Sequence, residues 1–481
     1  MAAEGSGGRS GKTFPSLGGA HAIAQKTALD LPHHEDAKST KERKEIYFRT
    51  SCPSCLRGEI VAPPLHKSIT LKVLSMPELY PYPRFSLAER DRRWKAVREK
   101  MAAQNIDVIV TPQNTGHSMD FQANTRYLTH CGGGGDADIA AVFPLHGDVT
   151  AIATSANPRW TVTQEWTTDV REARREYGKI IVQRLKELAV DHGRIGITGL
   201  GEVEGTRTPE GTILHGTWQR IRDAFPNATL VDATPILVEV RYTKSQEEID
   251  VLTRSMEIVE EGYKAEIEAA KPGARDWDVW AAAQYAMMRN GSEMPVHCNW
   301  ISGKNVVRTL TRPSMRLLEY GDLIINELEA NWCGYRSQGV QPVFVGTADP
   351  VHQELIKVQR EIFNRLIENL KPGVTVKELA ELTIKTAESA APRSGPAAGA
   401  RGDLNMHGRG AGDDGPIITA HAKSPKQLGV QLQENMVFIF KPSAVAADGK
   451  SLSTWGDTVV ITKNGGRRLG KRPHDLAVSG G

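Results

Sequence analysis

The sequence predicts an α/β domain followed by an α+β domain that is built from two similar halves. Three observations support this fold class. The chain has 481 residues, which is too long for one ordinary hydrophobic core. Strand-like and helical segments alternate from residue 86 to about residue 235. Beyond residue 237, a long amphipathic helix ending in Lys-Pro-Gly occurs twice. We therefore expect a leader over residues 1–75, an α/β domain over 76–236 and an α+β domain over 237–481.

The leader is expected to be disordered. It contains the Gly/Ser-rich run "MAAEGSGGRSGK" and the charge run "HHEDAKSTKERKE", and neither can bury much apolar surface. It also contains "CPSC", with Cys52 and Cys55. A zinc site would need a second Cys/His pair, and a redox pair would need a strand-helix setting, so we interpret both residues as free cysteines.

The α/β domain begins with a predicted helix. Ser86 and Glu89 form a capping-box pattern, and an apolar stripe follows at Leu87, Trp94, Val97 and Met101. The strand "IDVIVT", a hairpin around residues 146–148, the strand "RIGITGL", the helix "GTILHGTWQRIRDAF" and the strand "ATLVDA" come next. The glycine-rich "CGGGGDAD" lacks the strand-loop-helix setting of a phosphate loop, so we predict a flexible loop.

The α+β domain opens with a long helix. Ser245 and Glu248 form a second capping box, and apolar residues follow at spacings of three and four. Lys271-Pro272-Gly273 ends this helix, because proline cannot continue the hydrogen-bond ladder. A second helix, opened by Asp349-Pro350, ends at 371–373. Each leads into another helix and then into strands, so two halves joined sheet to sheet would leave a cleft.

Six features carry a resemblance to a known family. They are "VEVRYTKSQEEID", the two "KPG" helix ends, "GDLIINELEANWCGYRSQGVQPVFVG", "HGRGAGDDGP", "ENMVFIFKPS" and "GDTVVITKNGG". Their order and spacing, from about Phe85 to Gly466, resemble the superfamily of methionine aminopeptidase, aminopeptidase P, prolidase and creatinase. The resemblance implies a pita-bread C-terminal domain with an internal pseudo-twofold repeat, a creatinase-type N-terminal α/β domain and a homodimer.

The resemblance also implies a position for a metal site. Peptidases of this fold hold two divalent metals with two Asp, one His and two Glu, ligands that suit ions activating a bridging water. The matching positions here are Glu327, Gln338, His407, Lys441 and Gly456, with Asp457 next to the last. Lysine repels a metal, glutamine is a weak ligand and glycine offers none. We therefore predict no cofactor. The alternative is a single Mn, Co, Fe or Zn ion on Glu327, Glu329, His407 and Asp457.

Strand geometry relates these positions. "LIINELEA" alternates, so Glu327 and Glu329 share one face of a strand. The turn at residues 332–335 is expected to place Gln338 roughly opposite Glu327. The apolar run "MVFIF" ends at Lys441, and a buried ammonium needs an anion beside it. We hypothesise that Lys441 forms an ion pair with Glu327. The alternative is that the pair only neutralises carboxylates left from a former metal site.

Other candidates come from the same comparison. Creatinase uses a histidine as base, but the matching position here is Leu310, so creatinase activity is not expected. His297, in "MPVHCNW", is a nearby candidate base, with a hydrogen-bonded wall residue as the alternative. "HGRGAGDDGP" has acids where the peptidases have a second histidine, which resembles the superfamily's dimethylsulfoniopropionate lyase. For Asp413 and Asp414 the alternative is a solvated turn.

These features predict a hydrolase or lyase that cleaves a C–N or related bond in a small polar molecule without the usual metal pair. Catalytic candidates are His407, Lys441, Glu327 and His297, and substrate-binding candidates are Glu329, Gln338, Asp414 and Asp457. Two alternatives stay open: a metal-dependent Xaa-Pro aminopeptidase or prolidase, and an inactive binding protein.

Composition excludes some partners. Net charge is only +3, with no basic stripe carrying aromatics, so no nucleic acid is expected. No apolar stretch is long enough to span a membrane. Five cysteines and an N-terminus without an apolar signal core favour a reducing, cytoplasmic setting.

Overall fold

The computed structural model describes residues 83–113, 123–132, 138–155, 163–201, 211–294, 299–304, 306, 311–414, 417–418 and 425–480. All of them fall in one compact unit, residues 72–481. The predicted leader with Cys52 and Cys55, the candidate base His297 and Leu310 lie outside the described residues. No helix in the described ranges is both long and apolar enough to cross a membrane.

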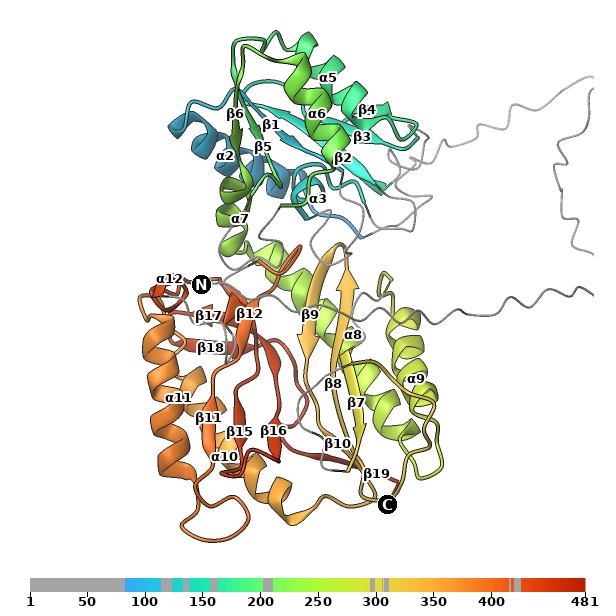
Figure 1. Ribbon diagram of the computed structural model, residues 1–481, viewed down its shortest axis with the longest axis vertical. Coiled ribbons are helices and arrows are strands. Elements are labelled where there is room, and N and C mark those ends of the chain that lie inside the picture. Colours follow the sequence, from blue (N-terminus) through green and yellow to red (C-terminus); the bar gives the residue numbers. More distant parts are fainter. Residues whose placement is uncertain are drawn as a thin grey trace, which may run out of the picture. The chain divides into compact units, whose positions relative to one another are not determined.

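The N-terminal part is built on one mixed six-stranded sheet (Figure 1). Its strand order is β4 (Asp169–Glu172), β3 (Thr150–Ala153), β2 (Ile139–Pro144), β1 (Val108–Thr111), β5 (Arg194–Ile197) and β6 (Thr229–Asp232). The helices α5 (Tyr177–Glu187) and α6 (His215–Ala224) pack on one face, in one apolar cluster with Val108 and Val110. The helices α2 (Leu87–Ala103), α3 (Ala123–Thr129) and α7 (Thr234–Tyr242) share the other cluster with Ile109. This is the predicted α/β architecture, and β2 and β3 form the expected hairpin.

The start of α2 differs from the prediction. The Ser86 side chain accepts a hydrogen bond from Glu89 N, but the Glu89 carboxylate does not return to the cap. It accepts instead from Arg92 and Arg93, and Ser86 N donates to Glu247. Leu87, assigned to the buried stripe, is 45% exposed, whereas Val97 and Met101 are buried. The pattern identified the helix but not the pairing of Glu89 with Arg92 and Arg93 or the contact between Ser86 and Glu247.

The C-terminal part contains two helix pairs, as the repeat predicts. They are α8 (Gln246–Ala269) with α9 (Asp276–Arg289), and α10 (Pro350–Ile367) with α11 (Val376–Ala390). Ser245 and Glu248 make the predicted capping box, and Asp349 caps α10. Gly273 and Gly373 have φ of 83° and 89°, a conformation that glycine adopts without strain. α10 stops earlier than predicted, with Glu368 as its C-cap.

Three sheets lie against these helices. One runs β19 (Ala477–Ser479), β10 (Val343–Val345), β8 (Leu323–Trp332) and β7 (Asn299–Gly303), with β9 (Tyr335–Gly339) paired to β8. The second runs β11 (Arg401–Asp403), β15 (Ser443–Val445) and β16 (Leu452–Thr454). The third runs β13 (Ile417–Ile418), β12 (Met406–Gly408), β14 (Val437–Phe440), β17 (Asp457–Thr462) and β18 (Gly465–Arg468). The short helix α12 (Pro425–Leu428) precedes β14.

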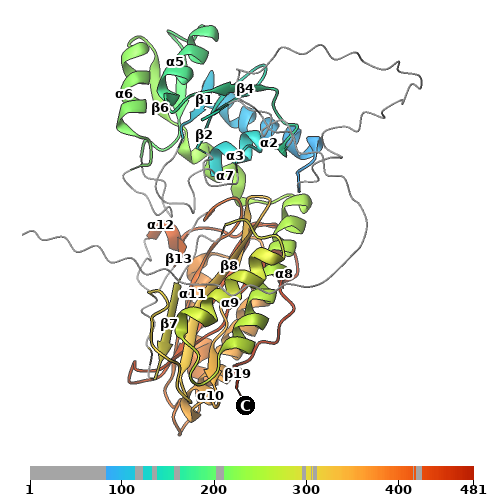
Figure 2. The same ribbon diagram turned by 90° about the vertical axis from the view of Figure 1, so that its right-hand side faces the viewer.

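Each helix pair covers its own strands. In Figures 1 and 2, α8 and α9 lie side by side and α8 contacts β8 and β9. α10 contacts β15 and β16, and α11 contacts β11. The two largest apolar clusters correspond to these layers.

One continuous register positions the candidate site. Phe440 pairs with Asp457, and Ser443 pairs with Thr454, so the intervening Lys441 stands opposite Gly456. Phe438 and Phe440 belong to the apolar cluster of α10 and α11, whereas Val437 belongs to that of α8. Because side chains alternate along a strand, Ile439, Lys441 and Ser443 point to the same side as Val437, toward β8 and β9.

Candidate functional site

Lys441 follows the last residue of β14 and forms the expected ion pair. Its Nζ atom lies 2.5 Å from Glu327 Oε1 and 3.3 Å from Gln338 Oε1. The other oxygen of Glu327 accepts from Asn299 Nδ2 at 2.9 Å. Lys441 is 3% exposed and Glu327 7%. An ammonium so deeply buried is stabilised only by such a partner.

Gln338 lies beside this pair, but its register differs from the prediction. Cys333 and Gly334 both have positive φ and form a two-residue hairpin turn in which Trp332 pairs with Tyr335. That turn places Gln338 opposite Glu329, not opposite Glu327. The backbone N–H and C=O of Gln338 bond to the Thr458 hydroxyl, which fixes β9 against β17.

A second buried ionic group contains Glu329 and the motif "HGRG". Arg409 Nη1 lies 2.6 Å from Glu329 Oε2 and donates to Asp413 Oδ1 at 2.8 Å. His407 Nδ1 is 3.5 Å from the same Asp413 oxygen. His407 pairs with Ile439 across β12 and β14, so it shares a face with Lys441.

Asp414 is also buried, at 2% exposure. It accepts from Arg241 Nε at 2.8 Å and from Lys244 Nζ at 3.0 Å. Both acids of "GDDG" are therefore buried in ion pairs. The solvated turn that was the alternative interpretation is wrong.

The remaining two positions do not join the group around Lys441. Gly456 has no side chain, and a Cβ there would lie 2.5 Å from Lys441 Cβ. Asp457 points to the opposite face of β17, where Arg468 Nε donates to it at 2.8 Å. Burial raises the pKa of Asp457, although Arg472 and Arg468 oppose that shift.

These residues do not fit a divalent metal. Within the described ranges, no group of three or more His, Cys, Asp and Glu side chains could hold an ion. Glu327 is paired with Lys441, Glu329 with Arg409, and Asp457 faces away. The four residues of the single-metal alternative are thus not brought together.

The charges of the residues around the site also argue against a pair of divalent metals. In the described ion pairs at the site and beside it, every acid already has at least one cation partner. The cations are Lys441, Arg409, Arg336, Arg241 and Lys244, and the anions are Glu327, Glu329, Asp413 and Asp414. A site for two divalent cations needs a net negative charge instead.

Sequence reasoning missed Asn299, Arg409 and Thr458. Arg409 was visible as a cation between His407 and two acids, a signal that "HGRG" provided. Asn299 and Thr458 gave no such signal, because their contacts depend on the pairing of β7 with β8 and of β9 with β17.

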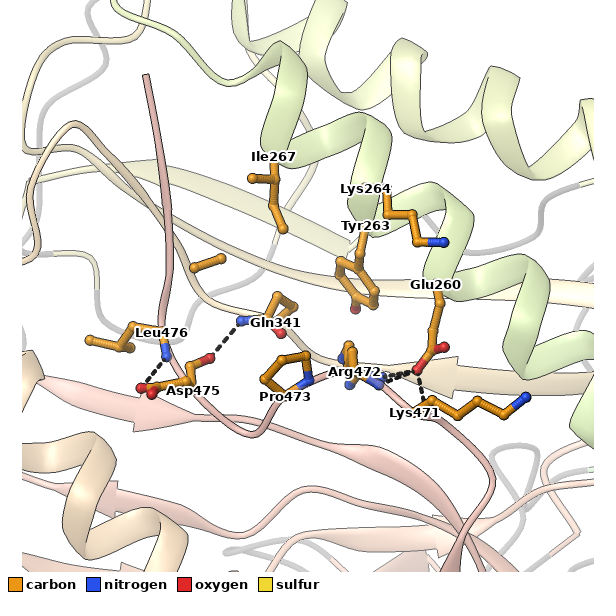
Figure 3. Close-up of a pocket in the computed structure, with 11 residues that line it drawn as sticks. Glu260, Tyr263, Lys264, Ile267, Gln341, Lys471, Arg472, Pro473, Asp475 and Leu476 are labelled. Carbon is orange, nitrogen blue, oxygen red and sulfur yellow. Dashed lines mark hydrogen bonds and ion pairs between the residues drawn. The ribbon is translucent and has the colours of Figure 1, made fainter. Parts of the chain in front are cut away.

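A cavity of about 490 Å³ lies elsewhere, between α8 and the segment 471–477 (Figure 3). Glu260 accepts from the backbone N–H groups of Lys471 and Arg472 at 2.6 and 2.8 Å. Tyr263, Ile267 and Leu476 make part of its wall. It contains none of the residues assigned to the site from the sequence.

Two family models match the chain. "Metallopeptidase family M24" matches residues 250–463, and "Creatinase/Prolidase N-terminal domain" matches residues 93–243. The fold and the matched regions define a pita-bread protein with a creatinase-type N-terminal domain. The chain belongs to the superfamily of creatinase, prolidase and aminopeptidase P, and its predicted fold class is confirmed.

Several curated proteins are similar over most of their length. The Xaa-Pro dipeptidase of Pyrococcus horikoshii is 25% identical over 346 residues, which cover 70% of this chain and 90% of that protein. The Xaa-Pro dipeptidase of Pyrococcus furiosus is 26% identical over 274 residues, 56% of this chain and 74% of that one. The creatinase of a Bacillus species is 24% identical over 307 residues, 62% of this chain and 70% of that one.

Solved structures agree on the fold. An X-Pro aminopeptidase from Thermotoga maritima has a TM-score of 0.64 at 19% identity and covers 80% of this chain and 99% of its own. The prolidase from Pyrococcus horikoshii has a TM-score of 0.62 at 21% identity, with the same coverage.

Proposed function

We propose that this chain is a pita-bread hydrolase or lyase that cleaves a C–N or related bond in a small polar molecule without a dinuclear metal centre. The observation that carries the proposal is the 2.5 Å contact between Lys441 Nζ and Glu327 Oε1. It puts a fixed cation where the resemblance places a metal-binding glutamate. Polar side chains that converge on one site suit the orientation of a small polar substrate.

The proposed roles follow from the contacts. Glu327 is held by Lys441 and Asn299, so its carboxylate keeps one orientation. The Asp413 carboxylate lies 3.5 Å from His407 Nδ1, where it stabilises positive charge on the imidazole ring. His407 then acts as general acid/base, and Lys441 stabilises negative charge that develops on the substrate.

A second candidate is an Xaa-Pro peptidase. The names of the relatives favour a peptide substrate more than a non-peptide one, because two of those described above are Xaa-Pro dipeptidases. The site opposes the metal-dependent form of this activity, since only His407 keeps both its type and its position among the five ligands. The third candidate is a binding protein without turnover.

The experiment begins with metal analysis of the purified full chain. Turnover is then screened on Xaa-Pro dipeptides, amidines and betaines, with and without EDTA. We expect no stoichiometric metal, EDTA-insensitive turnover of a small substrate, and a loss of about 100-fold or more in Lys441→Met and His407→Gln. Lys450→Met removes an exposed lysine and is the matched control, expected to keep full activity.

Each candidate has its own outcome. Stoichiometric metal with EDTA-sensitive cleavage of Xaa-Pro dipeptides would overturn the proposal in favour of the peptidase. Ligand-induced thermal stabilisation with no turnover on any substrate would support the binding protein. Full activity in Lys441→Met would contradict the catalytic role of that lysine.

A further inference from the structure

The long helix α8 has a glutamate on its buried face. Glu266 follows Val259 and Tyr263 at the helical spacing of the apolar stripe, and it is buried like them. Its exposed fraction is 0%. Burying an isolated carboxylate is costly, so a charged Glu266 would need a cation or several hydrogen-bond donors beside it.

The described hydrogen-bond partner of Glu266 is Asn326 of β8. Asn326 Nδ2 donates to Glu266 Oε1 at 2.5 Å, and Asn326 is also 0% exposed. Because side chains alternate along a strand, Asn326 shares a face of β8 with Leu328, which belongs to the apolar cluster of α8. The pair therefore joins α8 to the face of β8 that the helix covers, whereas Glu327 lies on the other face.

One oxygen of each side chain has no donor. Glu266 Oε2 and Asn326 Oδ1 are both buried, and neither has a hydrogen-bond partner among the described residues. A carboxylate oxygen and an amide oxygen only accept, so they cannot satisfy each other. A proton on Glu266 Oε2 removes both deficits, because the acid and the amide then each have one donor and one acceptor. Buried polar groups in folded proteins are nearly always satisfied, which favours this protonated form.

The helices and the C-terminal segment bring no cation against Glu266 among the described residues. α9 contributes Asp276, an acid that accepts from Trp300 Nε1 at 2.6 Å. On α8 itself, Tyr263 lies about one turn before Glu266. Arg472 of the C-terminal segment lies over the Tyr263 ring, 5.0 Å from its centroid.

The strands that contact α8 do not bring one either. β8 turns Glu327 and Glu329 to its other face, and β9 does the same with Arg336, which lies 3.8 Å from Glu329. β19 contains no titratable side chain. Burial raises the pKa of Glu266 well above its usual value, and the charge of Asp276 adds to that shift, although the hydrogen bond from Asn326 opposes it.

We propose that the Glu266 carboxyl group is protonated at neutral pH and donates from Oε2 to Asn326 Oδ1, so that two hydrogen bonds connect α8 to β8. Loss of the proton in alkali leaves a buried carboxylate against an amide oxygen and weakens this connection. Asn326 precedes Glu327 in β8, so the same pair helps to hold the strand of the candidate site. The inference is independent of the proposed function, because it needs no substrate and no turnover.

Infrared spectroscopy of the full-length protein detects the proton directly, because a carboxylic acid and a carboxylate absorb at different frequencies. At neutral pH we expect a carboxylic-acid band that is lost in Glu266→Gln. The band should persist in Glu268→Gln, which changes an exposed glutamate of the same helix. Identical carboxylic-acid absorption in the unaltered protein and Glu266→Gln would overturn the proposal.

Asn326→Val tests the partner. It removes the amide and leaves Glu266 in place, so the carboxylic-acid band should remain but move to higher frequency as its hydrogen bonds are lost. A band at the same frequency would contradict the pairing with Asn326. If this variant does not fold, the difference spectrum between the unaltered protein and Glu266→Gln still decides whether Glu266 is protonated.

The pH dependence of unfolding is a second readout. An unfolded glutamate is ionised above about pH 4.3, whereas the folded Glu266 keeps its proton, so the folded state binds more protons. The stabilising contribution is therefore complete below about pH 4.3 and is lost as the pH rises through the folded pKa. Within that window the unfolding equilibrium constant rises by up to about tenfold per pH unit.

Glu266→Gln should flatten this profile, since its amide donates to Asn326 Oδ1 at every pH. Urea unfolding of the full-length protein from pH 5 to pH 9 measures the difference, and Glu268→Gln should keep the slope of the unaltered protein. We expect Glu266→Gln to be at least as stable as the unaltered protein at pH 9. Parallel profiles for the unaltered protein and Glu266→Gln would overturn the proposal.

Discussion

Lys441 stands directly opposite Gly456, and the two strands are so close that a Cβ at position 456 would lie 2.5 Å from Lys441 Cβ. The same Cβ would lie 3.1 Å from Lys441 Cα and from Phe440 O. Shortening the lysine would therefore not make room. Strand spacing excludes a side chain at the position where the resemblance places the last metal-binding glutamate.

Gly456→Ala should consequently destabilise the protein. The added methyl group must push two paired strands apart, and overpacking of this kind costs about 1–3 kcal/mol. Chemical denaturation of both proteins at neutral pH measures the free energy of unfolding. Gly216→Ala is the control: it lies in α6, a Cβ there meets nothing within 4 Å, and alanine is the better helix former. An unchanged unfolding free energy for Gly456→Ala would show that β14 and β17 can move apart at little energetic cost.

The Lys441–Glu327 pair predicts a non-additive mutant cycle. Lys441→Met leaves the buried Glu327 carboxylate without its ammonium partner, and breaking such a pair costs about 3–5 kcal/mol. Adding Glu327→Gln removes the stranded charge. The double variant should therefore be more stable than Lys441→Met alone, as measured by urea unfolding. If the loss of unfolding free energy in the double variant equals the sum of the losses in the two single variants, the pair is not coupled.

The sequence predicted most of the architecture because its signals are local. Capping residues, apolar periods and Lys-Pro-Gly ends identified α8 and located the start of α10 within a residue or so. The hairpin register could also have been obtained, because a two-residue turn at Cys333 and Gly334 requires Gln338 to face Glu329. The expected turn at residues 332–335 was in the right place, but the pairing inferred from it was two residues off.

The site was predictable only in part, for a physical reason. Counting from motifs identified Glu327, Gln338, His407 and Lys441, and the reversed charge at 441 alone suggested an ion pair. The pairing of Arg409 with Glu329 was missed because the two residues are 80 positions apart in the sequence, whereas Asp413, four positions from Arg409, lies in the same motif. The burial of Asp414 depended on Arg241 and Lys244, which a turn pattern in the sequence does not reveal.

Restoring carboxylates should restore affinity for a metal. Gln338→Asp with Lys441→Glu would remove the cation and give acidic side chains at these two positions, beside Glu327 and His407. We expect the double variant to bind Mn²⁺ at least about tenfold more tightly than the unaltered chain, because hard divalent ions prefer carboxylate ligands. Calorimetric titration with Mn²⁺ measures this. Equal Mn²⁺ affinity in both proteins would mean that the positive charge of Arg409, which is unchanged in the double variant, determines metal affinity at this site.

His474 predicts the acid sensitivity of the fold. Its ring stacks on Trp455 with centroids 4.2 Å apart, and its Nε2 lies 2.5 Å from Gln359 Oε1. Burial lowers the pKa of His474 to about 3, and the charges of Arg360, Arg468 and Arg472 add to that shift. In the unfolded chain the pKa of a histidine is about 6.5, so between these values the unfolded state binds more protons. The stabilising contribution is therefore complete above about pH 6.5 and is lost as the pH falls toward 3.

His474→Phe should flatten this dependence. It keeps an aromatic ring against Trp455 but cannot take up a proton, so it removes a slope of up to about 1.4 kcal/mol per pH unit. Urea unfolding at intervals from pH 7 to pH 4 would measure the difference. The exposed His192→Gln provides the matched substitution and should leave the profile unchanged. The same steep loss of stability below pH 6.5 in His474→Phe would assign the acid sensitivity to another group.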